Sequence, residues 1–148
     1  MHVYLVRHGE ANSKDVDPER HLSGRGADHV RQIATDVVSD LGVRPARVVH
    51  SGKARARETA EIWSGLIDAD MAEGDGLAPN DDPSIWATRL EAEADDVMLV
   101  GHLPHLERLV GLLVTGDADA AAVAGFPAGG LVALERTDGG WAVSAARS

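Results

Sequence analysis

Short apolar segments alternate with amphipathic helical segments along most of this chain, and this alternation restricts the folds that the chain can adopt. Strands are expected at residues 2–6, 47–50, near 71, 96–100, 122–126, 130–135 and 141–145. Helices are expected at residues 23–41, 56–67, 84–93 and 104–113. The alternation predicts an α/β fold, with a three-layer α/β/α arrangement in which helices cover both faces of a mostly parallel sheet.

The C-terminal part of the chain differs from this pattern because its apolar segments are separated only by glycine-rich turns. Asp138-Gly139-Gly140 lies between the last two segments and predicts a β-hairpin. This hairpin could add an antiparallel edge to the sheet. No internal repeat is visible, and 148 residues fit one domain of ordinary size.

Composition excludes several classes of function. The chain has no cysteine, which rules out disulfides, thiolate catalysis and cysteine-based zinc sites. Its formal charge of −10 disfavours binding to nucleic acid and to anionic membrane surfaces. Neither a signal peptide nor a membrane span is expected, so the cytoplasm is the predicted location. Any anion site must be a local concentration of positive charge.

Arg7 and His8 come directly at the end of the first predicted strand, and Gly9 permits a sharp exit from the sheet. A neutral imidazole is a competent nucleophile toward phosphorus, and a guanidinium can hold two phosphoryl oxygens in its planar fork. The pair therefore suits phosphoryl transfer. Taken alone, the triplet is better explained by a structural or solvent-facing histidine.

A basic stretch from Ser51 to Ala60 begins the second predicted helix and contains Lys53, Arg55 and Arg57. A helix N-terminus attracts anions through its free N–H groups and its dipole, and Arg55 in the first turn can face the same anion. In isolation, a solvated charged face explains this stretch equally well.

His102 follows the strand predicted at residues 96–100, and the helix that begins at Pro104 comes directly after it. In open α/β sheets, ligands bind beyond the carboxyl ends of the strands, so His8 and His102 are expected at the same edge. There His102 can bind a phosphoryl oxygen or stabilise the charge of a transition state.

Four segments, taken together and in order, resemble those of the histidine phosphatase superfamily, also called the phosphoglycerate mutase-like family. They are Arg7-His8-Gly9-Glu10, Leu22-Ser23-x-x-Gly26, Ser-x-x-x-Arg-Ala-x-x-Thr at residues 51–59, and Gly-His-x-Pro at residues 101–104. The resemblance implies that His8 is a nucleophile that is transiently phosphorylated. It also implies a phosphate pocket formed by Arg7, Arg55 and His102, with neither a metal ion nor a cofactor.

Two features favour the small SixA-like phosphohistidine phosphatases within this family. Mutase-like members usually carry Ser or Thr three residues after the nucleophile and Asn three further on, whereas this chain has Ala11 and Lys14. Larger branches insert a cap after the second helix, whereas only 37 residues run from Ala60 to Asp96. The resemblance implies one domain, residues 1–148, without a large cap. The expected substrate is phosphohistidine on a partner protein or, alternatively, a small phosphorylated metabolite.

The general acid is the least defined part of the expected site. Imidazole leaves phosphohistidine more readily than an alkoxide leaves an ester, so this substrate depends less on an acid. The candidate acids are carboxylates of the loop after the second helix, although such groups are usually only solvated charges. They are Glu73, Asp75, Asp81 and Asp82. In the expected reaction, neutral His8 attacks phosphorus and water then hydrolyses the phosphohistidine, while the arginines and a protonated His102 hold the equatorial oxygens.

Other functions fit the same residues. A small-molecule phosphomonoesterase or mutase would need one of the loop carboxylates as its acid. A non-catalytic phosphoprotein-binding module would keep the pocket without turnover. A metal hydrolase fits poorly, because the sequence has no His-x-x-x-His pair or clustered carboxylates of the usual spacing.

Overall fold

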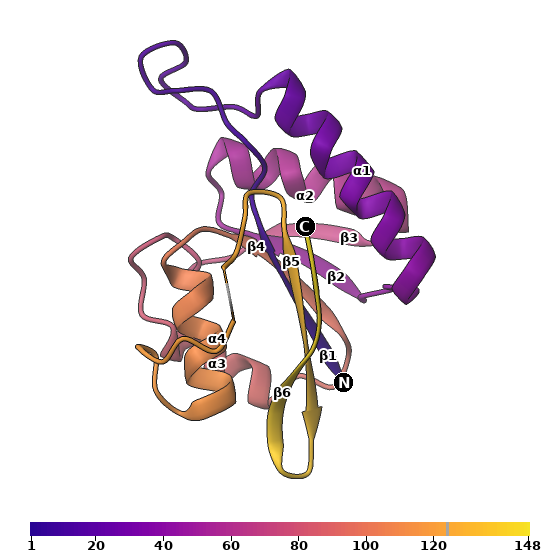
Figure 1. Cartoon of the computed structure of the whole chain (residues 1–148), viewed down its shortest axis with the longest axis vertical. Coiled ribbons are helices and arrows are strands. Elements are labelled where there is room, and N and C mark those ends of the chain that lie inside the picture. Colours follow the sequence, from indigo (N-terminus) through magenta and orange to yellow (C-terminus); the bar gives the residue numbers. More distant parts are fainter. Residues whose placement is uncertain (124) are drawn as a thin grey trace.

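A computed structural model describes residues 1–123 and 125–148. Within these residues the centre of the fold is a six-stranded sheet with the strand order β3-β2-β4-β1-β5-β6 (Figure 1). The strands are β1 (His2–Arg7), β2 (Arg47–His50), β3 (Asp70–Glu73), β4 (Val97–Gly101), β5 (Leu131–Thr137) and β6 (Gly140–Arg147). The first four run parallel, whereas β5 pairs antiparallel with both β1 and β6. The predicted mostly parallel sheet with an antiparallel edge hairpin is confirmed.

Helices cover both faces of this sheet, as the alternating pattern predicts. They are α1 (Gly24–Leu41), α2 (Ala54–Ile67), α3 (Ser84–Glu91) and α4 (His105–Thr115). Figure 1 shows α1 and α2 on one side of the strands and α3 and α4 on the other. Among the described residues, none of the helices combines the length and apolar character needed to cross a membrane.

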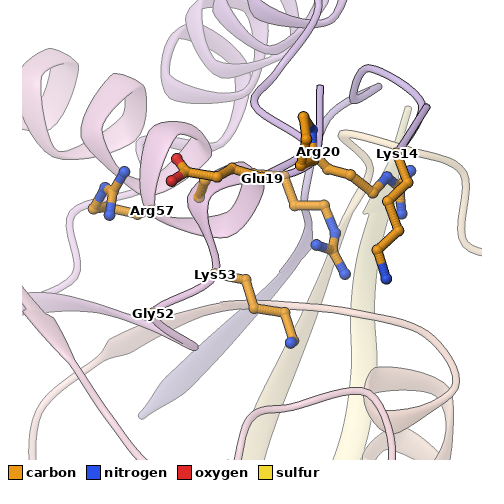
Figure 2. Close-up of a pocket in the computed structure, with 9 residues that line it drawn as sticks. Lys14, Glu19, Arg20, Gly52, Lys53 and Arg57 are labelled. Carbon is orange, nitrogen blue, oxygen red and sulfur yellow. The ribbon is translucent and has the colours of Figure 1, made fainter. Parts of the chain in front are cut away.

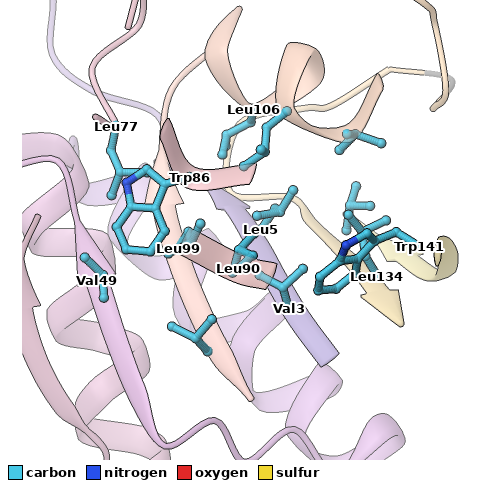
Figure 3. Packing of buried hydrophobic residues seen from close by; sticks show 14 of the residues in the cluster. Val3, Leu5, Val49, Leu77, Trp86, Leu90, Leu99, Leu106, Leu134 and Trp141 are labelled. Carbon is cyan, nitrogen blue, oxygen red and sulfur yellow. The ribbon is translucent and has the colours of Figure 1, made fainter. Parts of the chain in front are cut away.

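Two hydrophobic cores result from the alternation of side chains along the central strands. On β1, Val3 and Leu5 pack with the residues of α3 and α4, whereas Tyr4 and Val6 pack with those of α1 and α2. Figure 3 shows the first core, in which Trp86 of α3 packs near these strand residues. Burial on both faces explains why the central strands read as continuous apolar runs.

Helix α1 begins and ends where its capping residues predict. The Ser23 side chain accepts a hydrogen bond from the backbone N–H of Gly26 at 2.9 Å, which satisfies a free donor of the first turn. At the other end, Gly42 adopts a left-handed conformation with a φ of 62°, and its N–H donates to the carbonyl of Val38. The N-terminus of α1 is thereby fixed close to the end of β1.

The strand predicted at residues 122–126 is wrong; residue 124 of this segment lies outside the described residues. Residues 122, 123, 125 and 126 belong to no strand. Gly125 has a φ of 86°, and Pro127 follows at once, so the chain turns where a strand would have to continue. The apolar character of the segment reflects packing instead, since Phe126 is only 4% exposed in the first core.

Candidate active site

The ends of β1 and β4 bring His8 and His102 together. The two strands are parallel neighbours in which Arg7 pairs with Gly101, and the N–H of His8 donates to the Gly101 carbonyl at 3.0 Å. The centroids of the two imidazole rings lie 5.1 Å apart. The expectation that both histidines occupy the carboxyl edge of the sheet is confirmed.

His8 is held in the tautomer that a nucleophile requires. Its Nδ1 lies 2.7 Å from the carbonyl oxygen of Gly9. A carbonyl only accepts hydrogen bonds, so Nδ1 carries the proton and Nε2 keeps its lone pair. Burial lowers the pKa of His8 to about 4, and the nearby charge of Arg55 also lowers it, whereas the bond to Gly9 raises it. At neutral pH the ring is therefore uncharged, with a free Nε2.

Arg7 ends β1 and presents a buried nitrogen that has no partner. Its backbone N–H donates to Gly130 at 3.0 Å, and its Nη1 donates to the carbonyl of Phe126 at 2.9 Å. Its Nε is buried without a hydrogen-bond partner among the described residues. A buried donor left unpaired is costly and calls for an explanation, which a bound anion would supply.

Arg55 lies in the first turn of α2, and Thr59 one turn later ties that helix to the His8 loop. The Thr59 hydroxyl donates to the Arg55 carbonyl at 2.8 Å and accepts from the N–H of Gly9 at 3.0 Å. The Nε of Arg55, like that of Arg7, is buried without a partner in the part of the chain that the structure describes. Two unpaired guanidinium donors thus accompany His8.

His102 is a buried imidazole at the end of β4. Its Nε2 lies 2.6 Å from the hydroxyl of Ser51, and its Nδ1 has no partner within the described residues. Burial lowers the pKa of His102 to about 3, and the neighbouring His8 and Arg55 lower it further. In the free protein this lowered pKa favours a neutral His102, and a protonated His102 with the phosphoryl group bound stays a prediction. The structure brings together all four predicted residues, Arg7, His8, Arg55 and His102.

Arg20 also lies at this site, and sequence reasoning missed it. It has a left-handed backbone with a φ of 54°, and its Nε donates to the Asn12 carbonyl at 3.1 Å. Besides burial, the positive charge of Arg20 lowers the pKa of both His8 and Arg55. The segment around Arg20 has no periodicity that would mark a site residue. The only available signal is a cation in a mostly acidic loop.

The loop over residues 11–22 is braced by Asp17. The Asp17 carboxylate accepts from the backbone N–H of His21 at 2.8 Å and lies 2.9 Å from the His21 ring Nδ1. These bonds lower the pKa of Asp17 to about 2, and the bond from the backbone N–H has the larger effect on the pKa. The N–H of Asn12 in turn donates to the His21 carbonyl at 2.9 Å. The loop is therefore organised by its own hydrogen bonds.

Two of the four candidate acids are committed to structural roles. Asp75 forms an ion pair with Arg89 at 2.9 Å, and hydrogen bonding to that guanidinium lowers the pKa of Asp75. Asp82 accepts from the N–H of Ser84 at 2.9 Å at the start of α3, and this bond lowers the pKa of Asp82. A general acid needs a pKa near the working pH, so both carboxylates are poorly suited to donate a proton.

The other two candidates differ in position. Asp81 accepts from the N–H of Ala78 at 2.9 Å within its own loop. The Glu73 carboxyl lies against Gly52. A Cβ added to this glycine would come within 2.7 Å of the Glu73 Cδ. Gly52 connects β2 to α2 beside the site. Glu73 therefore lies at the end of β3, and not in a loop, with its carboxyl beside the turn that leads into α2.

No metal centre is apparent in this arrangement. Within residues 1–123 and 125–148, no group of three or more histidine, aspartate or glutamate side chains is placed to hold a metal ion. The site instead combines neutral imidazoles with guanidinium groups, which together can bind an oxyanion and attack a phosphorus atom.

Comparison with curated proteins gives partial matches. No family model matches the chain. The serine/threonine-protein phosphatases Pgam5, mitochondrial, of Drosophila willistoni and Drosophila grimshawi are 38% and 36% identical to it over 72 residues. This is 48% of the present chain but only 24% and 25% of those proteins. The chain therefore matches about a quarter of the length of these relatives.

Comparison with solved structures covers nearly the whole chain. A structure from Agrobacterium tumefaciens assigned as the phosphohistidine phosphatase SixA is 28% identical, with a TM-score of 0.80, over 99% of this chain and 97% of that one. The protein histidine phosphatase SixA in complex with tungstate superimposes with a TM-score of 0.85 at 24% identity, over 100% of this chain and 97% of that one, and supports the fold. The chain therefore has the histidine phosphatase fold of these SixA structures, and Arg7, His8, Arg55 and His102 lie together at the carboxyl edge of its sheet.

Proposed function

We propose that this protein is a phosphatase that uses His8 as a covalent nucleophile and acts on phosphohistidine presented by a partner protein. The observation that carries the proposal is the state of His8. Its ring is neutral, with the proton on Nδ1, and it lies among guanidinium groups whose buried Nε atoms have no partner among the residues that the structure describes. Residues 1–148 would act as one domain without a large cap.

In the first step, Nε2 of His8 attacks phosphorus in line with the bond that breaks. A bond forms between Nε2 and phosphorus, and the substrate imidazole leaves with the electron pair of the broken phosphorus–nitrogen bond. The other nitrogen of the substrate ring carries a proton, so the ring leaves as neutral imidazole and needs no general acid. Arg7 and Arg55 hold the equatorial oxygens through donors that are unpaired in the free protein.

In the second step, water attacks the phosphorus atom of phospho-His8. The new oxygen–phosphorus bond releases Nε2 with its electron pair, and inorganic phosphate leaves the pocket. The hydrogen bond from Nδ1 to Gly9 keeps the ring in position through both steps. The bound dianion offers His102 a charged acceptor and raises the pKa of that imidazole from its low value in the free protein.

Three observations support phosphohistidine over a phosphate ester. Asp75 and Asp82 have lowered pKa values, so they are poor acids for an alkoxide leaving group. Residues 60–96 contain the rest of α2, β3 and α3 with the connections between them, and these elements belong to the sheet and to its covering helices. The SixA structure from Agrobacterium tumefaciens matches nearly the full chain. A small-molecule phosphomonoesterase remains the second candidate, with Glu73 as its acid because of the position of that carboxyl beside Gly52.

The test compares phosphate release by the wild type, by His8→Ala and by His29→Asn, with a chelator present. His29 lies on an exposed part of α1 and serves as the matched histidine control. The substrates are a phosphohistidine-bearing protein and a panel of small phosphomonoesters. We expect turnover of the phosphohistidine protein, at least a ~1,000-fold loss in His8→Ala, and near-wild-type rates in His29→Asn.

A trapping experiment examines the intermediate directly. Rapid quenching of the wild type at alkaline pH should yield an acid-labile phosphoryl group that mass spectrometry assigns to His8. Faster turnover of a phosphomonoester, lost in Glu73→Gln, would favour the second candidate. Absence of any His8-dependent turnover would leave a phosphoprotein-binding module.

A further inference from the structure

Positive charge is concentrated at one opening of this acidic protein. The chain has a formal charge of −10 and only two lysines, Lys14 and Lys53, which lie 39 positions apart in sequence. Both line the same pocket of about 550 Å³. Its other charged lining residues are Arg20, Arg55 and Arg57 on the positive side and a single acidic residue, Glu19. Arg55 is shared with the candidate active site, so the pocket leads to it.

The orientation of the side chains shows which of the basic residues that line the pocket lie together at its opening. Figure 2 shows that Lys14, from the loop over residues 11–22, and Lys53, at the start of α2, extend toward the same opening. Arg20 lies on the same side of the pocket as Lys14, whereas Arg57 points away. We call Lys14, Arg20 and Lys53 the basic rim.

The charges of the basic rim are not neutralised within the protein. Across the stretches that the structure describes, none of its three residues takes part in an ion pair. The Nε of Arg20 donates to a backbone carbonyl, which leaves its charge uncompensated. Lys14 and Lys53 are exposed, so an incoming group can reach both.

The loop that carries Lys14 has a defined position. Asp17 binds the backbone and the ring of His21, and residues 11 and 22 form an isolated antiparallel bridge that closes the loop. Lys14 is therefore presented by a braced loop and not by a free chain end. The loop therefore loses less conformational entropy when a partner binds than a flexible segment would lose.

The two kinds of cation suit different anions. Guanidinium groups match the fixed geometry of phosphoryl oxygens, and Arg7 and Arg55 supply these beside His8. A lysine ammonium is a compact charge on a flexible stem, suited to carboxylates whose positions vary. Because the rest of the surface repels acidic partners, a positive opening would also orient such a partner as it approaches.

From these observations we infer that the basic rim is a docking surface for an acidic segment of the phosphoprotein substrate. Carboxylates that flank the phosphorylated side chain bind Lys14 and Lys53 while the phosphoryl group occupies the pocket at His8. This inference rests on the proposed function, because it deepens the choice of substrate at the same site.

The experiment uses two peptides of equal length that carry phosphohistidine, one flanked by Asp and Glu and the other by Asn and Gln. Values of kcat/KM are measured for the wild type, for Lys14→Gln/Lys53→Gln and for Arg31→Gln/Arg44→Gln. The last variant removes the same charge from positions that do not line the pocket. We expect the wild type to prefer the acidic peptide by about tenfold, mainly through KM and mostly at low salt. The lysine variant should reduce this ratio to near one, whereas the control variant should keep it.

A binding measurement separates docking from turnover. His8→Ala, with and without the two lysine substitutions, is titrated with the same peptides carrying a stable phosphohistidine analogue. A preference for the acidic peptide that depends on the lysines supports docking even if no peptide is hydrolysed, in which case the proposed function alone fails. Equal affinity for both peptides overturns the inference and leaves the proposed function intact if turnover is normal. A lysine effect of equal size on a small bisphosphate would also overturn it, because the rim would then serve a metabolite.

Discussion

His8 shows how a single backbone contact can define the chemistry of a residue. The Gly9 carbonyl binds Nδ1, so the proton is on that nitrogen and the lone pair is on Nε2. Burial then keeps the ring uncharged at neutral pH. The sequence places His8 at the end of a strand, but the tautomer depends on where the next carbonyl points, which only the folded backbone determines.

The pKa of His8 sets the acid limit of activity. Protonation of Nε2 removes the attacking lone pair, and the pKa lies at about 4, below the ordinary value of 6.5. We therefore expect kcat/KM for a small aromatic phosphomonoester to stay level down to about pH 5 and to fall as the pH drops through about 4. Arg20→Gln removes a charge that lowers this pKa, so its acid limb should lie at higher pH. Stopped-flow pH profiles of both proteins measure the shift. Coincident acid limbs would contradict a charge effect of Arg20 on His8.

Ser51 is the residue that orients His102. Its hydroxyl is 2.6 Å from the His102 Nε2, and Nδ1 has no partner in the described part of the chain to hold the ring otherwise. We expect Ser51→Ala to lower kcat by about 10- to 100-fold with little change in stability, because the ring loses its orientation next to the reacting group. Ser51→Thr retains the hydroxyl and should restore most of the rate. If Ser51→Ala matches the wild type in single-turnover kinetics, the contact has no positioning role.

At the level of elements, the first turn of α1 packs against the loop that carries His8. A Cβ added to Gly26 would come within 2.0 Å of the Glu10 carbonyl oxygen, so the helix approaches this backbone more closely than any other residue would allow. Gly24, two positions earlier in the same turn, has no atom within 4 Å of its added Cβ. The two glycines thus form a matched pair that differs mainly in this close approach.

Substitution of these two glycines should have opposite effects. Gly26→Ala forces the helix away from residue 10, and we expect a loss of about 1–3 kcal/mol in the free energy of unfolding together with reduced kcat. Gly24→Ala removes backbone freedom from an exposed helical position and should be neutral or stabilising by up to about 1 kcal/mol. Urea denaturation and phosphate release measure both effects. Similar losses in the two variants would show that helix propensity, and not the close approach, dominates.

Most elements could be predicted from the sequence because their signals are local. The caps of α1 at Ser23 and Gly42, and the turn between β5 and β6, depend only on neighbouring residues. The segment at residues 122–126 could not be predicted, because Ala122, Val123 and Phe126 pack onto a core formed by distant elements. Its role, which is to place the Phe126 carbonyl against Arg7, depends on tertiary structure alone.

On the scale of the whole molecule, an oxyanion should stabilise the fold by binding the unpaired donors of Arg7 and Arg55. At an oxyanion concentration 100-fold above Kd, the expected gain in the free energy of unfolding is about 2.7 kcal/mol. Arg55→Gln should lose most of it, whereas Arg31→Gln should keep it. Thermal unfolding with tungstate or inorganic phosphate, with chloride as the control, gives the comparison. A gain in Arg55→Gln equal to that of the wild type would place the anion elsewhere.

The four central residues of the site could be predicted because they belong to segments that resemble a family. The residues around them could not. Arg20 and Lys14 lie in a loop without periodicity, and their approach to α2 depends on the fold of residues 11–22. The neutral state of His102 also follows from burial, which a sequence does not display.

The strand order has a consequence for how this protein is made. Strand β4 lies between β1 and β2, so the two strands that leave the ribosome first are not neighbours in the finished sheet. Until residues 97–101 have been synthesised, the nascent chain has strand edges that it cannot close by itself. Translation therefore produces His8 long before it produces the strand and the second imidazole that complete its surroundings, and during that interval the partner edge of β1 stays open.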